Sequence, residues 1–110
     1  MKEKLYKELS PREFVELKKK EKIWQLLDVR EPWEIKISNI PNSINIPMNN
    51  IEEKLDELKK YNPIAVLCRS GIRSAIVAEL LIRKSFTEVA NIEGGINEWA
   101  KSVDQKIQQY

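Results

Sequence analysis

Residues 64–84 read IAVLCRSGIRSAIVAELLIRK and decide the fold class. The first four residues are all apolar, as in a strand that is buried on both faces of a parallel sheet. Apolar side chains recur at helical spacing from residue 72 to residue 84, and a short loop that contains Gly71 separates the two parts. The segment therefore predicts a buried strand, a tight turn, and a helix that is buried over much of its surface.

The rest of the chain shows the same alternation between short apolar runs and helical spacing. Ser10, Pro11 and Glu13 supply an N-cap, a proline at the first helical position and an acid three residues after the cap, which predicts a helix to about residue 20. Pro32 begins a turn or a short helix. We also expect strands at residues 5–9, 23–29, 44–47 and 88–92, helices at residues 51–58 and 96–100, and a tight turn at residues 94–95. This order predicts an α/β architecture.

Length and composition limit the possible functions. The chain has 110 residues, of which 42% are hydrophobic, so we expect one domain over residues 1–110, with its core at about residues 5–101 and a polar C-terminal tail. The net charge of +2 is too small to favour a polyanion, so we expect no nucleic-acid and no membrane partner. The apolar runs are too short to span a bilayer and the first ten residues do not form a signal peptide, which predicts a reducing, cytoplasmic location.

Residue types that are missing or rare narrow the chemistry further. Histidine is absent, which removes the commonest zinc ligand and the commonest general base. Cys68 is the only cysteine, so it cannot belong to an intramolecular disulfide. The sequence implies no metal and no organic cofactor.

The loop that begins at Cys68 is the strongest candidate for a functional site. In open α/β sheets ligands bind beyond the carboxyl ends of the strands, and this is the tightest strand-to-helix turn in the sequence. Backbone amides of such a loop and the positive end of the next helix attract anions, and Arg69 and Arg73 add positive charge. The same field favours the thiolate over the thiol, so Cys68 could act as a nucleophile without histidine. Gly71 permits a close backbone approach, and the Ser70 hydroxyl could donate a hydrogen bond to a bound sulfur or oxygen anion.

Two of these residues keep a second interpretation. Cys68 could be a small buried hydrophobic residue without any chemistry. Arg73 could bind the anion, or it could brace the loop through an ion pair with Asp28 at the end of a neighbouring strand.

Four motifs, in this order, resemble the single-domain rhodaneses. They are LDVREP at residues 27–32, IP followed by INIP at residues 40–47, CRSGIRS at residues 68–74, and NIEGGI at residues 91–96 with Trp99. The resemblance covers about residues 5–101 and implies a rhodanese-like α/β fold, with a mainly parallel five-stranded sheet flanked by helices on both faces. The chain departs from the family pattern where the family often has glycine, histidine or alanine, at Ser38, Asn39, Asn42, Ser43 and Ser85. We expect the fold to survive these changes, because asparagine tolerates a left-handed backbone and can replace some hydrogen bonds of histidine.

The resemblance also implies an activity, in which Cys68 is the catalytic nucleophile and carries sulfane sulfur as a persulfide. The loop would cradle that sulfur and bind an anionic donor such as thiosulfate, through Arg69, Ser70, Gly71, Ile72 and Arg73. We expect the loop to be supported by Asp28, Arg30 and Ser74. The sulfur would then pass to cyanide, a thiol or a protein acceptor, so the expected enzyme is a sulfurtransferase of the thiosulfate type.

Two other functions remain as alternatives. A phosphatase or an arsenate reductase would use a similar loop, but only four residues separate Cys68 from Arg73, one fewer than in phosphatase loops of this kind, and Leu67 replaces the histidine before their cysteine. The second alternative is a noncatalytic rhodanese-like module that binds partner proteins or sulfur. Such modules often lose the loop, which this chain retains.

Overall fold

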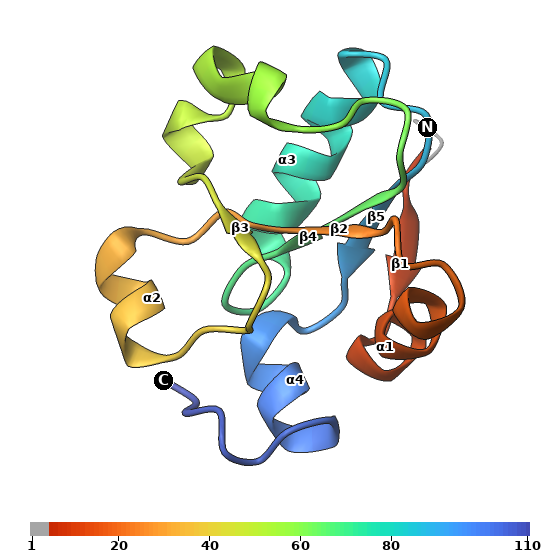
Figure 1. Cartoon of the computed structure of the whole chain (residues 1–110). Coiled ribbons are helices and arrows are strands. Elements are labelled where there is room, and N and C mark those ends of the chain that lie inside the picture. The colour runs from red at the N-terminus through yellow and green to blue at the C-terminus, as the bar shows by residue number, and fades with distance from the viewer. Residues whose placement is uncertain (1–4) are drawn as a thin grey trace.

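A parallel sheet forms the centre of the computed structural model, which describes residues 5–110 and leaves the first four residues of the expected domain outside the description (Figure 1). Within that range the sheet has five strands, and neighbouring strands all pair in parallel. Their spatial order is β1 (Lys7–Leu9), β5 (Val89–Ile92), β4 (Ile64–Leu67), β2 (Gln25–Asp28) and β3 (Ile44–Asn45). The expected α/β fold with a five-stranded parallel sheet is confirmed, although all strands except β4 are shorter than the apolar runs that predicted them.

Helices connect these strands. Between residues 5 and 110 the α-helices are α1 (Pro11–Lys20), α2 (Pro32–Ile37), α3 (Ile72–Arg83) and α4 (Gly95–Ser102), and the 3-10 helices are η1 (Met48–Asn50) and η2 (Glu52–Glu57). None of the helices in this range has both the length and the apolar character that crossing a membrane requires.

The sheet separates two apolar cores, because successive side chains along a strand point to opposite faces. Leu27 and Val66 belong to the core that also contains Leu81 of α3. Their chain neighbours Leu26 and Ala65 belong to the second core, which is covered by α1 and α4. Figure 1 shows α3 on one side of the sheet and α1 with α4 on the other. Both faces are therefore buried, which explains why β4 is apolar at every position.

Helix α1 begins with the capping box that the sequence predicts. Ser10 Oγ accepts a hydrogen bond from the Glu13 amide at 3.1 Å, and Glu13 Oε1 accepts one from the Ser10 amide at 2.7 Å. Two of the unpaired amides at the helix start are satisfied in this way, and Pro11 has no amide hydrogen to satisfy. The helix ends at Lys20, as expected.

Residues 51–58 differ from the expected helix. They form the 3-10 helix η2, and Lys54 inside it has non-helical backbone angles of φ −123° and ψ 20°. Ile51 and Leu58 flank the 3-10 helix, and both are buried. Their packing fixes the two ends of the segment, and the residues between them form tight 3-10 turns. Apolar spacing alone does not separate a 3-10 helix from an α-helix over so few residues.

Two of the three departures from the family pattern at glycine positions have a left-handed backbone, whereas Ser38 is extended with a φ of −161°. The φ angle is 67° at Asn42 and 69° at Ser85. Asparagine adopts this region at little cost, which agrees with the expectation that Asn42 would be tolerated. Serine has no such advantage, and left-handed backbone costs about 1–2 kcal/mol for residues with a side chain.

We predict that Ser85→Gly stabilises the protein. Glycine removes the left-handed strain but makes the unfolded chain more flexible, so the net gain should be about 0.5–1 kcal/mol, or a few degrees in Tm. Thermal unfolding followed by circular dichroism measures it. Asn42→Gly is the matched control, with a smaller gain expected. A lower Tm for Ser85→Gly than for the unchanged protein would contradict the prediction.

Candidate active site

Cys68 lies at the carboxyl end of β4, on the floor of the loop that leads into α3. Only 1% of its surface is exposed. The Gly71 amide donates a hydrogen bond to Cys68 Sγ at 3.1 Å, and Gly71 itself is the N-cap of α3 with a φ angle of 104°. The sulfur therefore faces a backbone donor at the positive end of a helix.

The other loop residues take different positions around the sulfur. Arg69 and Ser70 are exposed, and Ile72 is 72% exposed at the first position of α3. Ser74 is buried behind the sulfur, where its Oγ accepts a hydrogen bond from the Cys68 thiol at 3.3 Å. The structure thus brings Ser74 directly to Cys68.

Helix α4 holds the loop through its backbone. The amide of Ile96 donates to the Cys68 carbonyl at 2.9 Å, and the amide of Asn97 donates to the Arg69 carbonyl at 3.2 Å. Gly95 makes this approach possible, since a Cβ at this position would lie 2.4 Å from the Arg69 carbonyl oxygen and 2.5 Å from that of Cys68. The Gly-Gly pair is more than the tight turn that the sequence predicts, because it brings α4 against the active-site loop.

Asp28 pairs with Arg30, so the ion pair between Asp28 and Arg73 that the sequence offered as one alternative is wrong. Arg30 Nε donates to Asp28 Oδ1 at 3.0 Å and Arg30 Nη2 donates to Oδ2 at 2.8 Å, with both side chains completely buried. The Arg30 amide adds a third bond to Asp28 Oδ1. Arg30 is only two residues away in the chain and satisfies both oxygens of Asp28, so Arg73 pairs with a different carboxylate.

Every N–H of the Arg30 guanidinium has a hydrogen-bond acceptor, as the burial of a cation requires. Besides Asp28, Nη2 donates to the Ser38 carbonyl at 2.8 Å, and Nη1 donates to the Glu34 carbonyl at 3.2 Å and to the Tyr110 hydroxyl at 3.0 Å. Burial disfavours the charged form, but the bonds with Asp28 and Tyr110 outweigh it and raise the pKa of Arg30. Arg30 thereby joins the end of β2 to the middle of α2, at Glu34, and to its C-cap, Ser38.

Arg73 forms a two-pronged ion pair with Glu34 of α2. Its Nη1 lies 2.7 Å from Glu34 Oε2 and its Nη2 lies 2.8 Å from Glu34 Oε1. The hydrogen bond with Arg73 is the main reason why the pKa of Glu34 is lowered from 4.5 to about 2. Since both terminal nitrogens of Arg73 are engaged, the geometry favours the brace interpretation of this residue, with a partner other than the expected one.

Comparison with known proteins gives the family of this fold and loop. The sequence model of the Rhodanese-like domain family matches residues 10–102. The chain belongs to this family. A sulfurtransferase from Allochromatium vinosum is 36% identical over 76 residues, which make up 69% of this chain and 71% of that protein. The crystal structure of a rhodanese-related protein from Thermoplasma volcanium has a TM-score of 0.80 and 35% identity, covering 89% of this chain and 94% of that one. The resemblance to single-domain rhodaneses is confirmed.

The rhodanese-like domain also matches a part of larger proteins. The adenylyltransferase and sulfurtransferase UBA4 of Debaryomyces hansenii is 39% identical over 94 residues, which are 77% of this chain but 21% of that protein. The chain therefore spans about a fifth of the length of this relative. A relative of similar length and this longer one are thus both named sulfurtransferases, and their names share no more specific activity.

A partly buried hydrogen-bond network behind Cys68 includes two residues that the sequence analysis missed, Asn91 and Glu8. Asn91 Nδ2 donates to Glu8 Oε1 at 2.9 Å and to the Gly71 carbonyl at 3.3 Å. Both of these atoms only accept, so the amide orientation of Asn91 is determined and its Oδ1 must accept from the Ser74 hydroxyl. The Ser74 proton is thus engaged by Asn91, and the Ser74 oxygen offers a lone pair to the thiol of Cys68.

Glu34 and Tyr110 were also missed by the sequence analysis. Glu34 has one local signal, since it is the third residue of α2 and forms a capping box with Glu31, whose amide donates to Glu34 Oε2 at 2.8 Å. Its ion pair with Arg73 joins residues 39 positions apart, and Tyr110 is 76 positions from Glu34. No spacing rule connects side chains at such separations.

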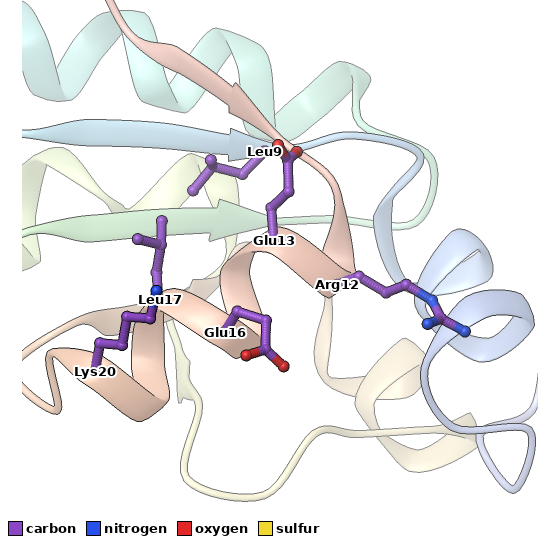
Figure 2. Close-up of a pocket in the computed structure, with 6 residues that line it drawn as sticks. All are labelled: Leu9, Arg12, Glu13, Glu16, Leu17 and Lys20. Atoms are coloured by element: carbon purple, nitrogen blue, oxygen red, sulfur yellow. The ribbon is translucent and has the colours of Figure 1, made fainter.

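A groove along α1 lies apart from this loop. It has a volume of about 410 Å³ and is lined by Leu9, Arg12, Glu13, Glu16, Leu17 and Lys20, none of which belongs to residues 68–74. Figure 2 shows the Arg12 side chain pointing away from Leu9 and Leu17. Within residues 5–110, no group of three or more His, Cys, Asp or Glu side chains is placed to hold a metal ion.

The ion pair of Glu34 should make stability depend on acid pH. Because its pKa is lowered from 4.5 to about 2, the stabilisation is complete above about pH 4.5 and is lost as the pH falls toward 2. The shift corresponds to about 3 kcal/mol of the free energy of unfolding. Urea unfolding between neutral and acid pH measures this loss. Glu34→Gln should flatten the profile in that range, whereas Glu79→Gln, which removes an exposed ion pair with Arg83, should leave it unchanged.

Gly95→Ala should disturb the loop as well as the stability. The new methyl group would meet the backbone of Cys68 and Arg69, at a left-handed position with a φ of 61°, so we expect a loss of more than about 2 kcal/mol. The alkylation rate of Cys68 by iodoacetamide and the Tm both measure the effect. Gly94→Ala is the control, because its Cβ would meet the side chain of Glu98 instead of the loop. Equal Cys68 reactivity in the two variants would argue against a loop role for Gly95.

Proposed function

We propose that this rhodanese-like domain transfers sulfane sulfur from an anionic donor such as thiosulfate to a nucleophilic acceptor, through a persulfide on Cys68. The observation that carries the proposal is the position of Cys68 Sγ, 3.1 Å from the amide that begins α3. Such an amide can donate a hydrogen bond to the attacking sulfur and to the persulfide that forms from it. The relatives named sulfurtransferases support the same class of chemistry.

The proposed reaction has two displacements. In the first, the Cys68 thiolate attacks the outer sulfur of thiosulfate, the sulfur–sulfur bond of the donor breaks, and sulfite leaves with the electron pair. In the second, cyanide or a thiolate attacks the outer sulfur of the persulfide, and Cys68 returns as a thiolate. Neither step needs a proton shuttle, so the absence of histidine is compatible with the mechanism.

Charge at the loop favours an anionic donor. Arg73 is neutralised by Glu34, whereas Arg69 is exposed beside the loop and has no carboxylate partner within residues 5–110. We therefore assign Arg69 the main charge contact with the donor, and Arg73 the role of a brace. Gly71, Ser70 and Ile72 form the rest of the cradle, and Ser74, Asp28 and Arg30 support it.

The same geometry disfavours the phosphatase alternative. Phosphoryl transfer requires an arginine that is free to stabilise the charge on the equatorial oxygens. Arg73 has both terminal nitrogens on Glu34, and the loop is one residue shorter than phosphatase loops of this kind.

The acceptor is proposed to be an external nucleophile. Cys68 is the only cysteine, so no second thiol of this chain can attack the outer sulfur of the persulfide and accept it. A low-molecular-weight thiol, cyanide or a protein thiol would complete the cycle, and a reducing compartment such as the cytoplasm suits a reaction that starts and ends with a free thiolate.

Intact mass spectrometry after incubation with thiosulfate tests the proposal. We expect the protein to gain the mass of one sulfur atom, to lose it on addition of cyanide, and to gain nothing when Cys68 is replaced by serine. No gain with thiosulfate or with any other sulfane donor would contradict the proposal and favour a noncatalytic module.

The role of charge is tested in the same assay. Arg69→Gln should raise the thiosulfate concentration that is needed for half-maximal persulfide formation, because the donor loses its charge partner. Arg83→Gln removes the same charge at the far end of α3, where Arg83 pairs with Glu79, and should have no effect. Equal effects of the two variants would show that only the net charge matters.

A further inference from the structure

Tyr110 lies in the polar tail that the sequence left without assigned structure, and its side chain enters the ion network beside the active-site loop. Figure 1 shows the C-terminal end of the described chain close to α2. The Tyr110 hydroxyl donates to Glu34 Oε1 at 2.7 Å and accepts from Arg30 Nη1 at 3.0 Å. Burial is the main reason why the pKa of Tyr110 is raised, so the hydroxyl remains protonated and able to donate at neutral pH.

The backbone of Tyr110 is anchored by the same residue that holds the loop. Asn97 Nδ2 donates to the Tyr110 carbonyl at 3.1 Å, and the Tyr110 amide donates to Asn97 Oδ1 at 3.2 Å. The backbone amide of Asn97 donates to the carbonyl of Arg69. One residue of α4 therefore sets the positions of both Tyr110 and Arg69.

The guanidinium of Arg69 lies over the aromatic ring of Tyr110. The Arg69 Cζ lies 4.9 Å from the ring centroid, within the range of a cation–π interaction. Trp33 packs against the ring in a T-shaped arrangement, with a centroid distance of 6.3 Å. Tyr110 is fixed by Trp33, by its hydroxyl bonds and by Asn97, whereas Arg69 is exposed.

A fixed guanidinium binds an anion better than a free one. An exposed arginine side chain loses rotamer freedom when a ligand immobilises it, and this loss weakens binding. Stacking on one face of the guanidinium leaves its N–H edge available to oxygen ligands. The contact with Tyr110 removes part of that entropic cost before the donor arrives.

We propose that Tyr110 is a positioning residue for the anionic donor, and that it acts by holding the Arg69 guanidinium at the mouth of the Cys68 loop. This proposal rests on the proposed function for the identity of the donor. It assigns the tail a part in donor recognition, and it makes the ring, rather than the hydroxyl, the group on which donor affinity depends. The hydroxyl contributes to the stability of the Arg30–Glu34 network.

Thiosulfate binding to the Cys68→Ser protein tests the proposal without any reaction. Isothermal titration calorimetry in this background should show about two- to fivefold weaker binding for Tyr110→Leu, which corresponds to about 0.5–1 kcal/mol. Tyr110→Phe retains the ring and should bind thiosulfate within about twofold of the parent, with a lower Tm, because a hydrogen-bond partner of the buried ion network is lost. Weaker binding in the Phe variant, equal to that in the Leu variant, would overturn the role of the ring.

A double-mutant cycle separates positioning from a general structural effect. Once Arg69→Gln is present, Tyr110→Leu should cause no further loss of affinity, because the ring acts only through Arg69. Additive losses, tighter binding in Tyr110→Leu, or no measurable binding of thiosulfate to the parent would each overturn the proposal. Arg69→Lys provides a test at an exposed position where folding is not at risk: it retains the charge without the planar stack and should also weaken binding.

Persulfide formation in the protein with Cys68 intact is measured in parallel. Binding that follows the expected cycle while no variant forms a persulfide would refute the proposed function and leave the role of Tyr110 in anion binding supported. If the protein forms a persulfide but the losses of affinity in the double-mutant cycle are additive, the proposed function is supported and the role of Tyr110 is refuted.

Discussion

The buried ion pair between Asp28 and Arg30 is the interaction on which the rest of the site depends. Both side chains are excluded from water, and removal of one partner would leave a buried charge at a cost of about 3–5 kcal/mol. The guanidinium of Arg30 reaches from the end of β2 to the carbonyls of Glu34 and Ser38, which fixes α2 against the sheet. Glu34 can then present its carboxylate to Arg73, and the start of α3 is held in place.

The loop around Cys68 is held from two sides by different forces. On the α2 side the contacts are charged, and the two acids and two arginines of this network balance each other. On the α4 side they are backbone hydrogen bonds that depend on the absence of a side chain at Gly95. Rigid support from both sides keeps the sulfur and its amide donor in place before any ligand binds, which is what electrostatic preorganisation requires.

Local patterns in the sequence predicted local structure well. Residues that act on near neighbours in the chain were interpreted correctly, such as Ser10 with Glu13 in the capping box and Gly71 at the turn into α3. The prediction failed for the helix at residues 51–58, where the packing of its two ends decides the backbone geometry. It also failed for the partner of Asp28, because several arginines were available and sequence spacing does not rank them.

Periodicity and capping predicted the α/β class and placed Cys68 at the end of a buried strand, because both patterns depend on residues that are close in the chain. The four ordered motifs carried the resemblance that implied the parallel sheet, the family and the role of Cys68 as nucleophile. Which charges pair and which residues surround the sulfur became known from the packed structure. Arg73 meets Glu34 from 39 residues away, and Tyr110 reaches Arg30 across 80 residues. Such contacts are set by how the elements pack, because the energy of a buried charge depends on every group around it and not on its place in the chain.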